Sequence, residues 1–207
     1  MRMKTFYAAA LAVATTIAVA SAASVPWTAA KAKVGEAAPA FALTDTDGNT
    51  VNLSDFKGKT VVLEWFCPQC PWSGRQSGKS VHSTGQVNDL IKGIKAADEN
   101  AVYLLIDSSG GLMSKDKLAK TDAGLRTRYK LSAPILIDWD GTVGRNYGAK
   151  TTPHMYVIDG EGVLRYAGAF SDKRKTNYVL GAVKQIAAGE KVSPTEVKSW
   201  GCGVKYN

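Results

Sequence analysis

The sequence contains little cysteine and little histidine. Only three cysteines and two histidines occur among 207 residues, too few for a scaffold built on disulfides. No second C-x-x-C and no H-x-x-H is present to complete a zinc site with Cys67 and Cys70. The chain also lacks a G-x-G-x-x-G segment between a strand and a helix, so no nicotinamide or flavin cofactor is expected. The fold must therefore rest on an apolar core, which leaves the cysteines available for chemistry.

The composition predicts a folded globular protein. Hydrophobic residues make up 45% of the chain and charged residues 21%, whereas disordered chains combine low hydrophobicity with high net charge. The formal charge is +8, from 26 basic and 18 acidic residues. The basic clusters at residues 115–130 and 173–175 are mixed with Asp116, Asp122 and Asp172, and Tyr129 is the only aromatic residue within them. We interpret them as solvated faces and expect no nucleic-acid partner.

Residues 1–22 have the features of a cleavable signal peptide. Arg2 and Lys4 precede an uncharged run rich in alanine and valine, and Ala20 and Ala22 give the small-x-small pattern of a cleavage site. The run is shorter than the roughly 20 residues of a membrane span, although an uncleaved anchor is the alternative. We therefore expect an exported, periplasmic or secreted protein without a membrane span in the mature chain.

Strand and helix patterns alternate along the rest of the chain. Continuous apolar runs indicate buried strands, and apolar residues three and four apart indicate helices. We expect a leader at residues 23–33, one domain at residues 34–189 and a C-terminal tail packed on it at residues 190–207. The expected strands are residues 41–43, 51–53, 60–66, 101–107, 134–138, 155–159 and 163–168, and the expected helices are a long one from the cysteines to about residue 98, then residues 115–129, 142–147 and 176–188. This order predicts an α/β fold in which helices flank a mixed sheet.

Cys67-Pro68-Gln69-Cys70 directly follows the strand expected at residues 60–66. If a helix begins there, cysteines three residues apart lie on one side of it. The positive end of the helix dipole would then favour the thiolate of Cys67, lowering its pKa by about one unit. The order strand, C-x-x-C, helix favours a redox dithiol. Half of a zinc site and an inert disulfide are the alternatives.

Several segments occur in a characteristic order along the chain, at residues 34–41, 53–59, 62–65, 70–72, 151–159, 166–169, 177–179 and 201–206. In these segments the chain resembles the thioredoxin-like superfamily, and specifically secreted redoxins grouped with alkyl hydroperoxide reductase and thiol-specific antioxidant proteins. The resemblance implies a thioredoxin fold with an N-terminal β-hairpin extension. It also implies that Pro153 is a cis-proline facing the cysteines and that the backbone of Thr152 is available to an incoming peptide or thiol. A trans proline opening an edge strand is the alternative.

The sequence departs from this branch at two points. Many of its members resemble Trp-x-Asn-Pro-x-Cys-Pro, so Cys67 stands where asparagine is common. Peroxiredoxins have threonine or serine three residues before the peroxidatic cysteine, and here Cys67 occupies that position before Cys70. No matching arginine is evident. These differences favour a dithiol over a peroxidase.

Other residues have a functional and a structural interpretation. Glu64 either relays protons to the second thiol or pairs with Lys57, Lys59 or another surface cation. Trp65 and Trp72 either dock substrate or belong to the core. Cys202 either acts as a resolving cysteine, joins a relay, links to a partner or is a small apolar residue of the tail. His82 and His154 would join the cysteines only if the protein bound copper or zinc.

The sequence thus predicts an exported thiol–disulfide oxidoreductase that acts on protein or small-molecule thiols and disulfides. Cys67 attacks, Cys70 resolves, and Glu64, Thr152 and Pro153 support them. A thiol peroxidase that uses Cys70 with Cys67 or Cys202 is the first alternative. A copper- or zinc-binding redoxin is the second.

Overall fold

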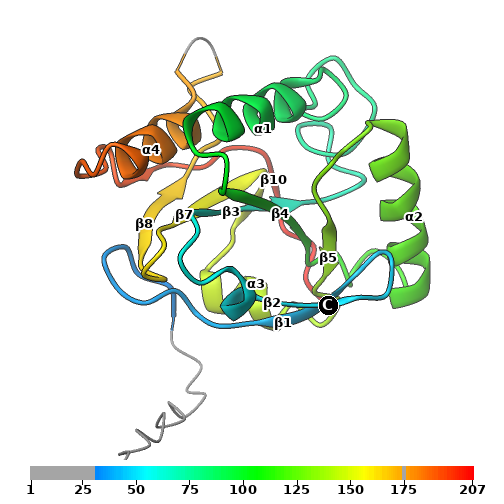
Figure 1. Cartoon of the computed structure of the whole chain (residues 1–207). Helices are drawn as coiled ribbons and strands as arrows, with labels where there is room; N and C mark the ends of the chain where they lie inside the picture. The colour runs from blue at the N-terminus through cyan, green and yellow to red at the C-terminus, as the bar shows by residue number, and fades with distance from the viewer. Residues whose placement is uncertain (1–30, 174–175) are drawn as a thin grey trace, which may run out of the picture.

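An eight-stranded mixed sheet forms the centre of the computed structural model, which describes residues 31–173 and 176–207 (Figure 1). The signal peptide expected at residues 1–22 and most of the leader lie outside the described residues. Within the described part of the chain, no helix is long and apolar enough to cross a membrane.

The sheet has the order β2-β1-β5-β4-β3-β7-β8-β9. Strands β3, β4 and β5 run parallel to one another, β7 is antiparallel to both β3 and β8, and β9 is parallel to β8. All six residues of β3 are buried because helices cover both faces of the central strands. The strand bounds are β1 Ala42–Asp45, β2 Thr50–Asn52, β3 Val61–Phe66, β4 Val102–Asp107, β5 Ile135–Ile137, β7 His154–Ile158, β8 Leu164–Gly168 and β9 Glu196–Val197.

Two apolar cores lie on opposite faces of this sheet. Helices α1 (Gln86–Ala97) and α4 (Tyr178–Ala187) pack together over one face, and α2 (Lys115–Arg128) lies beside β5 (Figure 1). Helix α3 (Thr142–Tyr147) packs on the other face, where side chains of the β1–β2 hairpin also contact the core. The expected mixed sheet flanked by helices is confirmed. The N-terminal hairpin expected from the resemblance is also present, followed by the 3₁₀ turn η1 (Leu53–Phe56).

The helix expected directly after the cysteines is wrong. Residues 67–85 form successive turns, and α1 begins only at Gln86. Serine hydroxyls in this segment bond to nearby backbone carbonyls, including Ser77 Oγ to Pro71 O at 2.6 Å and Ser80 Oγ to Ser73 O. Such bonds compete with helical ones, and glycines in the segment weaken a helix further.

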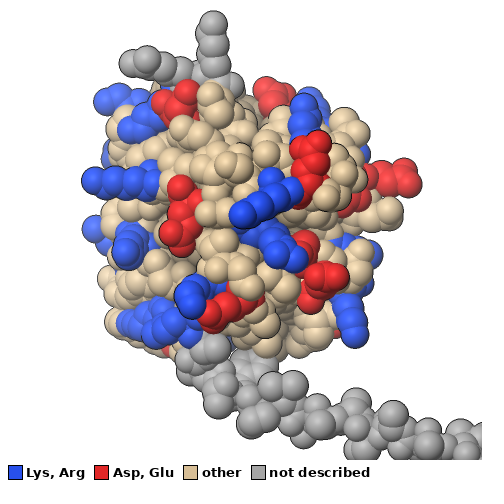
Figure 2. Space-filling view, turned by 90° about the vertical axis from the view of Figure 1, so that its left-hand side faces the viewer, with Lys and Arg blue, Asp and Glu red and all other residues tan. Residues whose placement is uncertain are grey.

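The C-terminal tail adds strands that the sequence pattern did not predict. Strand β9 extends the main sheet beside β8. Strand β10 (Cys202–Gly203) pairs antiparallel with the short strand β6 (Thr151–Thr152), which directly precedes Pro153. The chain ends near α3, where Tyr206 Oη donates to Ala149 O at 2.8 Å. Acidic and basic side chains are mixed on the face shown in Figure 2, as expected for solvated surfaces.

Candidate active site

Cys67 and Cys70 lie on a tight loop that leaves the end of β3. The carbonyl of Cys67 accepts hydrogen bonds from Cys70 N at 3.3 Å and from Gly74 N at 3.0 Å. A Cβ at position 74 would lie 2.6 Å from the Phe66 ring, so the loop can approach the strand only with glycine there. Both cysteines are free thiols and both are buried, with 3% and 2% of their surface exposed. Cys67 and Cys70 therefore form a dithiol on a compact loop, and neither cysteine lies in the first turn of a helix.

The surroundings of Cys67 disfavour its thiolate. Burial and then the charge of Asp107 raise the pKa of this thiol to about 11, and the nearby Ser109 hydroxyl and the Gln69 N–H only partly oppose the rise. Asp107 ends β4 and is the register partner of Phe66, which places it next to the cysteine loop. The lowered pKa expected from a helix end at Cys67 is wrong, because no helix begins there.

Asp107 belongs to a buried pair of carboxyl groups that sequence reasoning missed. Asp107 and Asp122, from β4 and α2, are both fully buried. Burial raises the pKa of both, and the charge of Asp107 contributes to the rise at Asp122. Burial therefore favours retention of a proton by this pair of carboxyl groups. The aspartate that ends the apolar run at residues 101–107 was the available signal, since this run pairs in parallel with the strand that leads to the cysteines.

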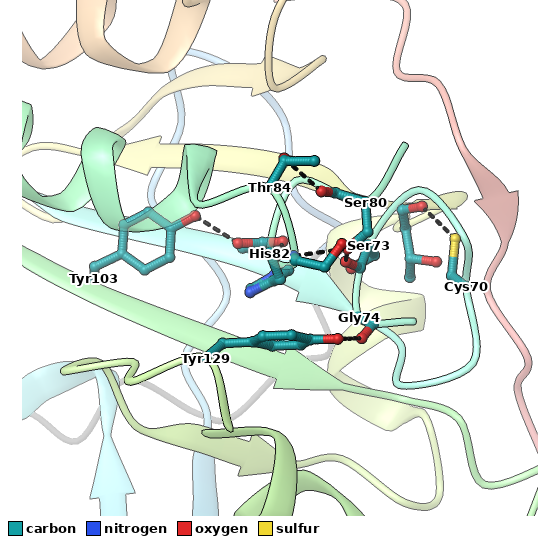
Figure 3. Close-up of polar contacts among 11 residues, drawn as sticks. Cys70, Ser73, Gly74, Ser80, His82, Thr84, Tyr103 and Tyr129 are labelled. Atoms are coloured by element: carbon teal, nitrogen blue, oxygen red, sulfur yellow. Dashed lines mark hydrogen bonds and ion pairs between the residues drawn. The ribbon is translucent and has the colours of Figure 1, made fainter. Parts of the chain in front are cut away.

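Cys70 faces the loop at Pro153. Its Sγ donates to the carbonyl oxygen of Thr152 at 3.1 Å, a contact shown in Figure 3. The Thr152–Pro153 peptide is cis, as the resemblance implied. The structure therefore brings Cys70, Thr152 and Pro153 together, with Cys70 nearer to this loop and Cys67 nearer to the buried carboxyls.

Cys202 lies against the same loop. It is the register partner of Thr152 in the β6–β10 pair and is only half-buried. Burial and then the neighbouring Cys70 raise the pKa of Cys202 to about 11. In Figure 3 the red C-terminal ribbon passes beside the loop that carries Cys70. The edge of Thr152 expected to meet an incoming peptide is thus occupied by the chain's own tail.

Glu64 is part of a buried polar network rather than a surface ion pair. Its two carboxylate oxygens lie 2.8 Å from His82 Nε2 and 2.6 Å from Tyr103 Oη, so the expected pairing with Lys57 or Lys59 is wrong (Figure 3). The nearby Tyr129 Oη donates to the carbonyl of Gly74 at 2.8 Å. The Tyr129 ring lies beside His82, with ring centroids 6.2 Å apart, so this network contacts the cysteine loop at Gly74.

The two tryptophans expected to dock substrate differ in position. Trp65 is fully buried, donates from Nε1 to Ser108 Oγ at 3.0 Å and packs against Tyr156 with ring centroids 5.0 Å apart. Docking by Trp65 is therefore wrong, and the residue belongs to the core. Trp72 is half-buried and packs edge-on against Trp200 of the tail at 5.9 Å.

A family model described as Redoxin matches residues 33–183, well over half of the chain. The chain belongs to the Redoxin family. The oxidoreductase class and the thioredoxin-like fold predicted from the sequence are thereby confirmed.

Relatives of this redoxin include enzymes of two named kinds. The thiol-disulfide oxidoreductase ResA of Bacillus thuringiensis subsp. konkukian is 27% identical over 135 residues, which cover 64% of this chain and 67% of the relative. Peroxiredoxin Q of Suaeda salsa is 32% identical over 167 residues, covering 76% and 70%. The crystal structure of a protein of Sinorhizobium meliloti, SMc02350, superposes with a TM-score of 0.70 at 23% identity, covering 84% of this chain and 95% of the other. That structural likeness shows the fold alone.

Both histidines of the redoxin are engaged away from the cysteines. His82 bonds to Glu64, and His154 Nδ1 accepts from Lys150 N at 3.2 Å and lies 3.1 Å from Tyr156 Oη. Burial lowers the pKa of His154 to about 4. Among the described residues, no group of three or more His, Cys, Asp or Glu side chains is placed to hold a metal ion. The copper and zinc alternatives therefore gain no support from these side chains.

Proposed function

We propose that this redoxin is a thiol–disulfide oxidoreductase that works through a reversible disulfide between Cys67 and Cys70. The observation that carries the proposal is the position of Cys70 Sγ, 3.1 Å from the carbonyl of the residue before a cis-proline, on a loop that folds back onto Cys67. The name of the ResA relative supports the same reaction. The electrons are carried by the sulfur atoms, so the reaction requires no cofactor.

The two sulfurs take different parts in the proposed reaction. The Cys70 thiolate attacks a disulfide of the oxidised substrate, forms a mixed disulfide and releases one substrate thiolate. The Cys67 thiolate then attacks Cys70, releases the second substrate thiolate and leaves Cys67 and Cys70 joined as a disulfide. The substrate gains two electrons and the dithiol loses two. Run backward, the same steps oxidise a dithiol.

These parts are the reverse of those expected from the sequence. The helix end that favoured Cys67 as the attacking thiol is absent, and the pKa of Cys67 is raised to about 11. Cys70 instead faces the cis-proline loop. Asp107 is the register partner of Phe66, next to the cysteine loop, and burial raises its pKa to about 7, which suits it to accept the Cys67 proton as the resolving step begins.

A redox titration tests this function. The Cys202→Ser chain, which retains Cys67 and Cys70, is equilibrated in buffers of reduced and oxidised glutathione and then alkylated for mass spectrometry. We expect one reversible two-electron transition joining Cys67 to Cys70, which is lost in the matched control Cys67→Ser/Cys202→Ser. Two thiols that stay reduced, or that collect only glutathione adducts, would contradict the proposal.

A second experiment assigns the attacking sulfur. The Cys67→Ser/Cys202→Ser and Cys70→Ser/Cys202→Ser chains each keep one cysteine and are mixed with glutathione disulfide, a small substrate that does not require the tail to undock. We expect mixed disulfides on Cys70 in the first chain and few on Cys67 in the second. The opposite yield would restore the assignment made from the sequence.

Peroxide reduction is a second candidate function, favoured by the similarity to peroxiredoxin Q. In this reaction the Cys70 thiolate attacks a peroxide oxygen, the alcohol or water leaves, and the sulfenic acid condenses with Cys67 or Cys202 to release water. Stopped-flow mixing of the reduced chain with hydrogen peroxide decides the question. A fast oxidation that depends on Cys70 supports the peroxidase, and the slow oxidation of an ordinary thiol excludes it.

We also propose that the reaction takes place outside the cytoplasm, on protein or small-molecule disulfides. The support is the signal-peptide pattern of residues 1–22. Determination of the N-terminal residue of the purified mature protein tests export. A mature chain that begins at Ala23 supports it, and one that begins at Met1 opposes it.

A further inference from the structure

The C-terminal strand β10 occupies the edge at which Cys70 would meet an incoming chain. Cys202 pairs with Thr152 in the antiparallel β6–β10 register, and the Thr152 carbonyl oxygen also accepts the Cys70 thiol at 3.1 Å. The Thr152 hydroxyl is buried without a hydrogen-bond partner among the described residues. The segment nearest to Cys70 on this edge is therefore the chain's own residues 201–203.

The position of Cys202 is fixed from both sides. On one side, Trp200 packs on Trp72, donates from Nε1 to Ser171 O at 2.7 Å and is covered by Lys173, whose Nζ lies 4.8 Å from the Trp200 ring. On the other side, Tyr206 bonds to the main chain at Ala149. A cysteine held between two such anchors has lost most of its conformational freedom before any bond forms, which favours an intramolecular reaction with Cys70.

Gly201 allows the tail to approach this closely. A Cβ at position 201 would overlap the Thr152 carbonyl oxygen and lie 2.8 Å from its carbonyl carbon. The glycine also has φ +129°, a conformation that other residues rarely adopt. The sequence therefore contains, next to Cys202, the one residue type that permits contact with the cis-proline loop.

The three cysteines differ in their access to solvent. Cys67 and Cys70 expose 3% and 2% of their surface, whereas Cys202 is half-buried. Cys202 is therefore the most exposed of the three cysteines, and the one that an external protein disulfide reaches most readily. The accessible thiol is thus the one outside the C-x-x-C loop.

We propose that Cys202 is a third redox cysteine, which carries disulfides between outside partners and the Cys67–Cys70 pair through a Cys70–Cys202 disulfide. The inference rests on the proposed function and adds an entry point to it. It also defines the substrate class, because exposed disulfides that reach Cys202 are accepted while extended peptides that require the Thr152 edge are not.

Each step is a thiol–disulfide exchange that conserves atoms and electrons. The Cys202 thiolate attacks an external disulfide, forms a mixed disulfide and releases one external thiolate. The Cys70 thiolate attacks the sulfur of Cys202, forms the Cys70–Cys202 disulfide and releases the second external thiolate. The Cys67 thiolate then attacks Cys70, which forms the Cys67–Cys70 disulfide and returns Cys202 as a thiolate. Two electrons pass to the external disulfide, and its two thiolates take protons from solvent.

Substitution of Cys67, whose thiol acts in the last exchange step, should trap the Cys70–Cys202 disulfide. The Cys67→Ser chain is oxidised with glutathione disulfide, the remaining thiols are alkylated, and the disulfides are mapped by mass spectrometry of the digested protein. We expect an intramolecular Cys70–Cys202 disulfide as the main product. The matched control Cys70→Ser, in which Cys67 and Cys202 remain, is expected to give glutathione adducts and no internal disulfide.

The outcomes separate this inference from the function on which it rests. If the Cys67→Ser chain carries glutathione adducts on Cys70 and Cys202 and no internal disulfide, the proposed redox role of Cys202 is wrong. The titration of the Cys202→Ser chain still reports on the Cys67–Cys70 pair independently. As a measurement without substitution at the site, the native chain at intermediate glutathione ratios should contain both the Cys67–Cys70 and the Cys70–Cys202 disulfide, and absence of the latter counts against the inference.

Discussion

Substitution of Gly201 by alanine should release the tail from the cis-proline loop. The new Cβ would lie 2.8 Å from the Thr152 carbonyl carbon and 3.2 Å from Pro153 N, where ordinary contacts begin at 3.4 Å. Because the overlap with the Thr152 carbonyl oxygen is closer still, strand β10 would have to move away by about 1 Å or more to remove it. Alanine at φ +129° adds a backbone penalty of about 1–3 kcal/mol. Loss of strand pairing at Thr152 removes about 1 kcal/mol for each hydrogen bond.

These contributions give a loss of at least about 2 kcal/mol in tail docking, which is a factor of about 30 in the docking equilibrium. The assay is the rate at which iodoacetamide alkylates Cys70 in a chain whose other two cysteines are serine. Because Cys70 is buried under the tail, the rate should rise by about the same factor of 30 in Gly201→Ala.

Gly124→Ala is the matched control. Gly124 lies in α2, where an added Cβ would meet no heavy atom within 4 Å and the backbone is ordinary helix, so alanine there should stabilise the helix by about 0.5–1 kcal/mol. Its Cys70 alkylation rate should equal that of the parent chain. Equal rates in the Gly201→Ala chain and the parent would refute the conclusion that the tail covers Cys70.

Three further predictions concern buried carboxyl groups. In a chain whose only cysteine is Cys67, Asp107→Asn should lower the pKa of this thiol from about 11, while burial keeps it above 9.0, as measured by thiolate absorbance against pH; an unchanged pKa would remove Asp107 from the site. Glu64→Gln should cost about 2 kcal/mol in urea unfolding because two buried hydrogen bonds lose a charged acceptor, whereas Glu161→Gln at the surface should cost under about 1 kcal/mol, and equal losses would contradict the network. Burial raises the pKa of Asp122 above 3.8, so between these two pKa values the folded state keeps the Asp122 proton and the unfolded state does not. The free energy of unfolding should therefore fall by about 1.4 kcal/mol for each unit that the pH rises across this range. If Asp122→Asn leaves this pH dependence unchanged, the raised pKa of Asp122 is wrong.

Much of the fold could be read from local patterns. The run at residues 60–66 is apolar on both faces, as a central parallel strand must be, and the structure places β3 there. The hairpin around Gly48 follows from a residue that adopts φ +89° at the turn. The helix expected over residues 71–85 is absent because serine side chains there bond to backbone carbonyls, as Ser77 does to Pro71. These bonds depend on how the loop folds, so the sequence pattern does not reveal them.

The candidate site was less accessible to sequence reasoning. Cys67 and Cys70 were evident from their spacing, and the resemblance supplied the cis-proline at Pro153. The partners of Glu64 were not evident, because His82 is 18 residues away and Tyr103 is 39 residues away in the sequence. Such contacts depend on which strands and loops become neighbours.

The sequence by itself determined that this chain folds as a redoxin and carries a cysteine pair directly after a buried strand. Only the tertiary structure decided what surrounds each sulfur. Parallel pairing of β3 with β4 placed Asp107 beside Cys67, and pairing of β10 with β6 placed Cys202 beside Cys70. The physical reason is that a thiol's reactivity depends on burial, nearby charge and neighbouring sulfur, and in this protein those come from segments far away in the chain.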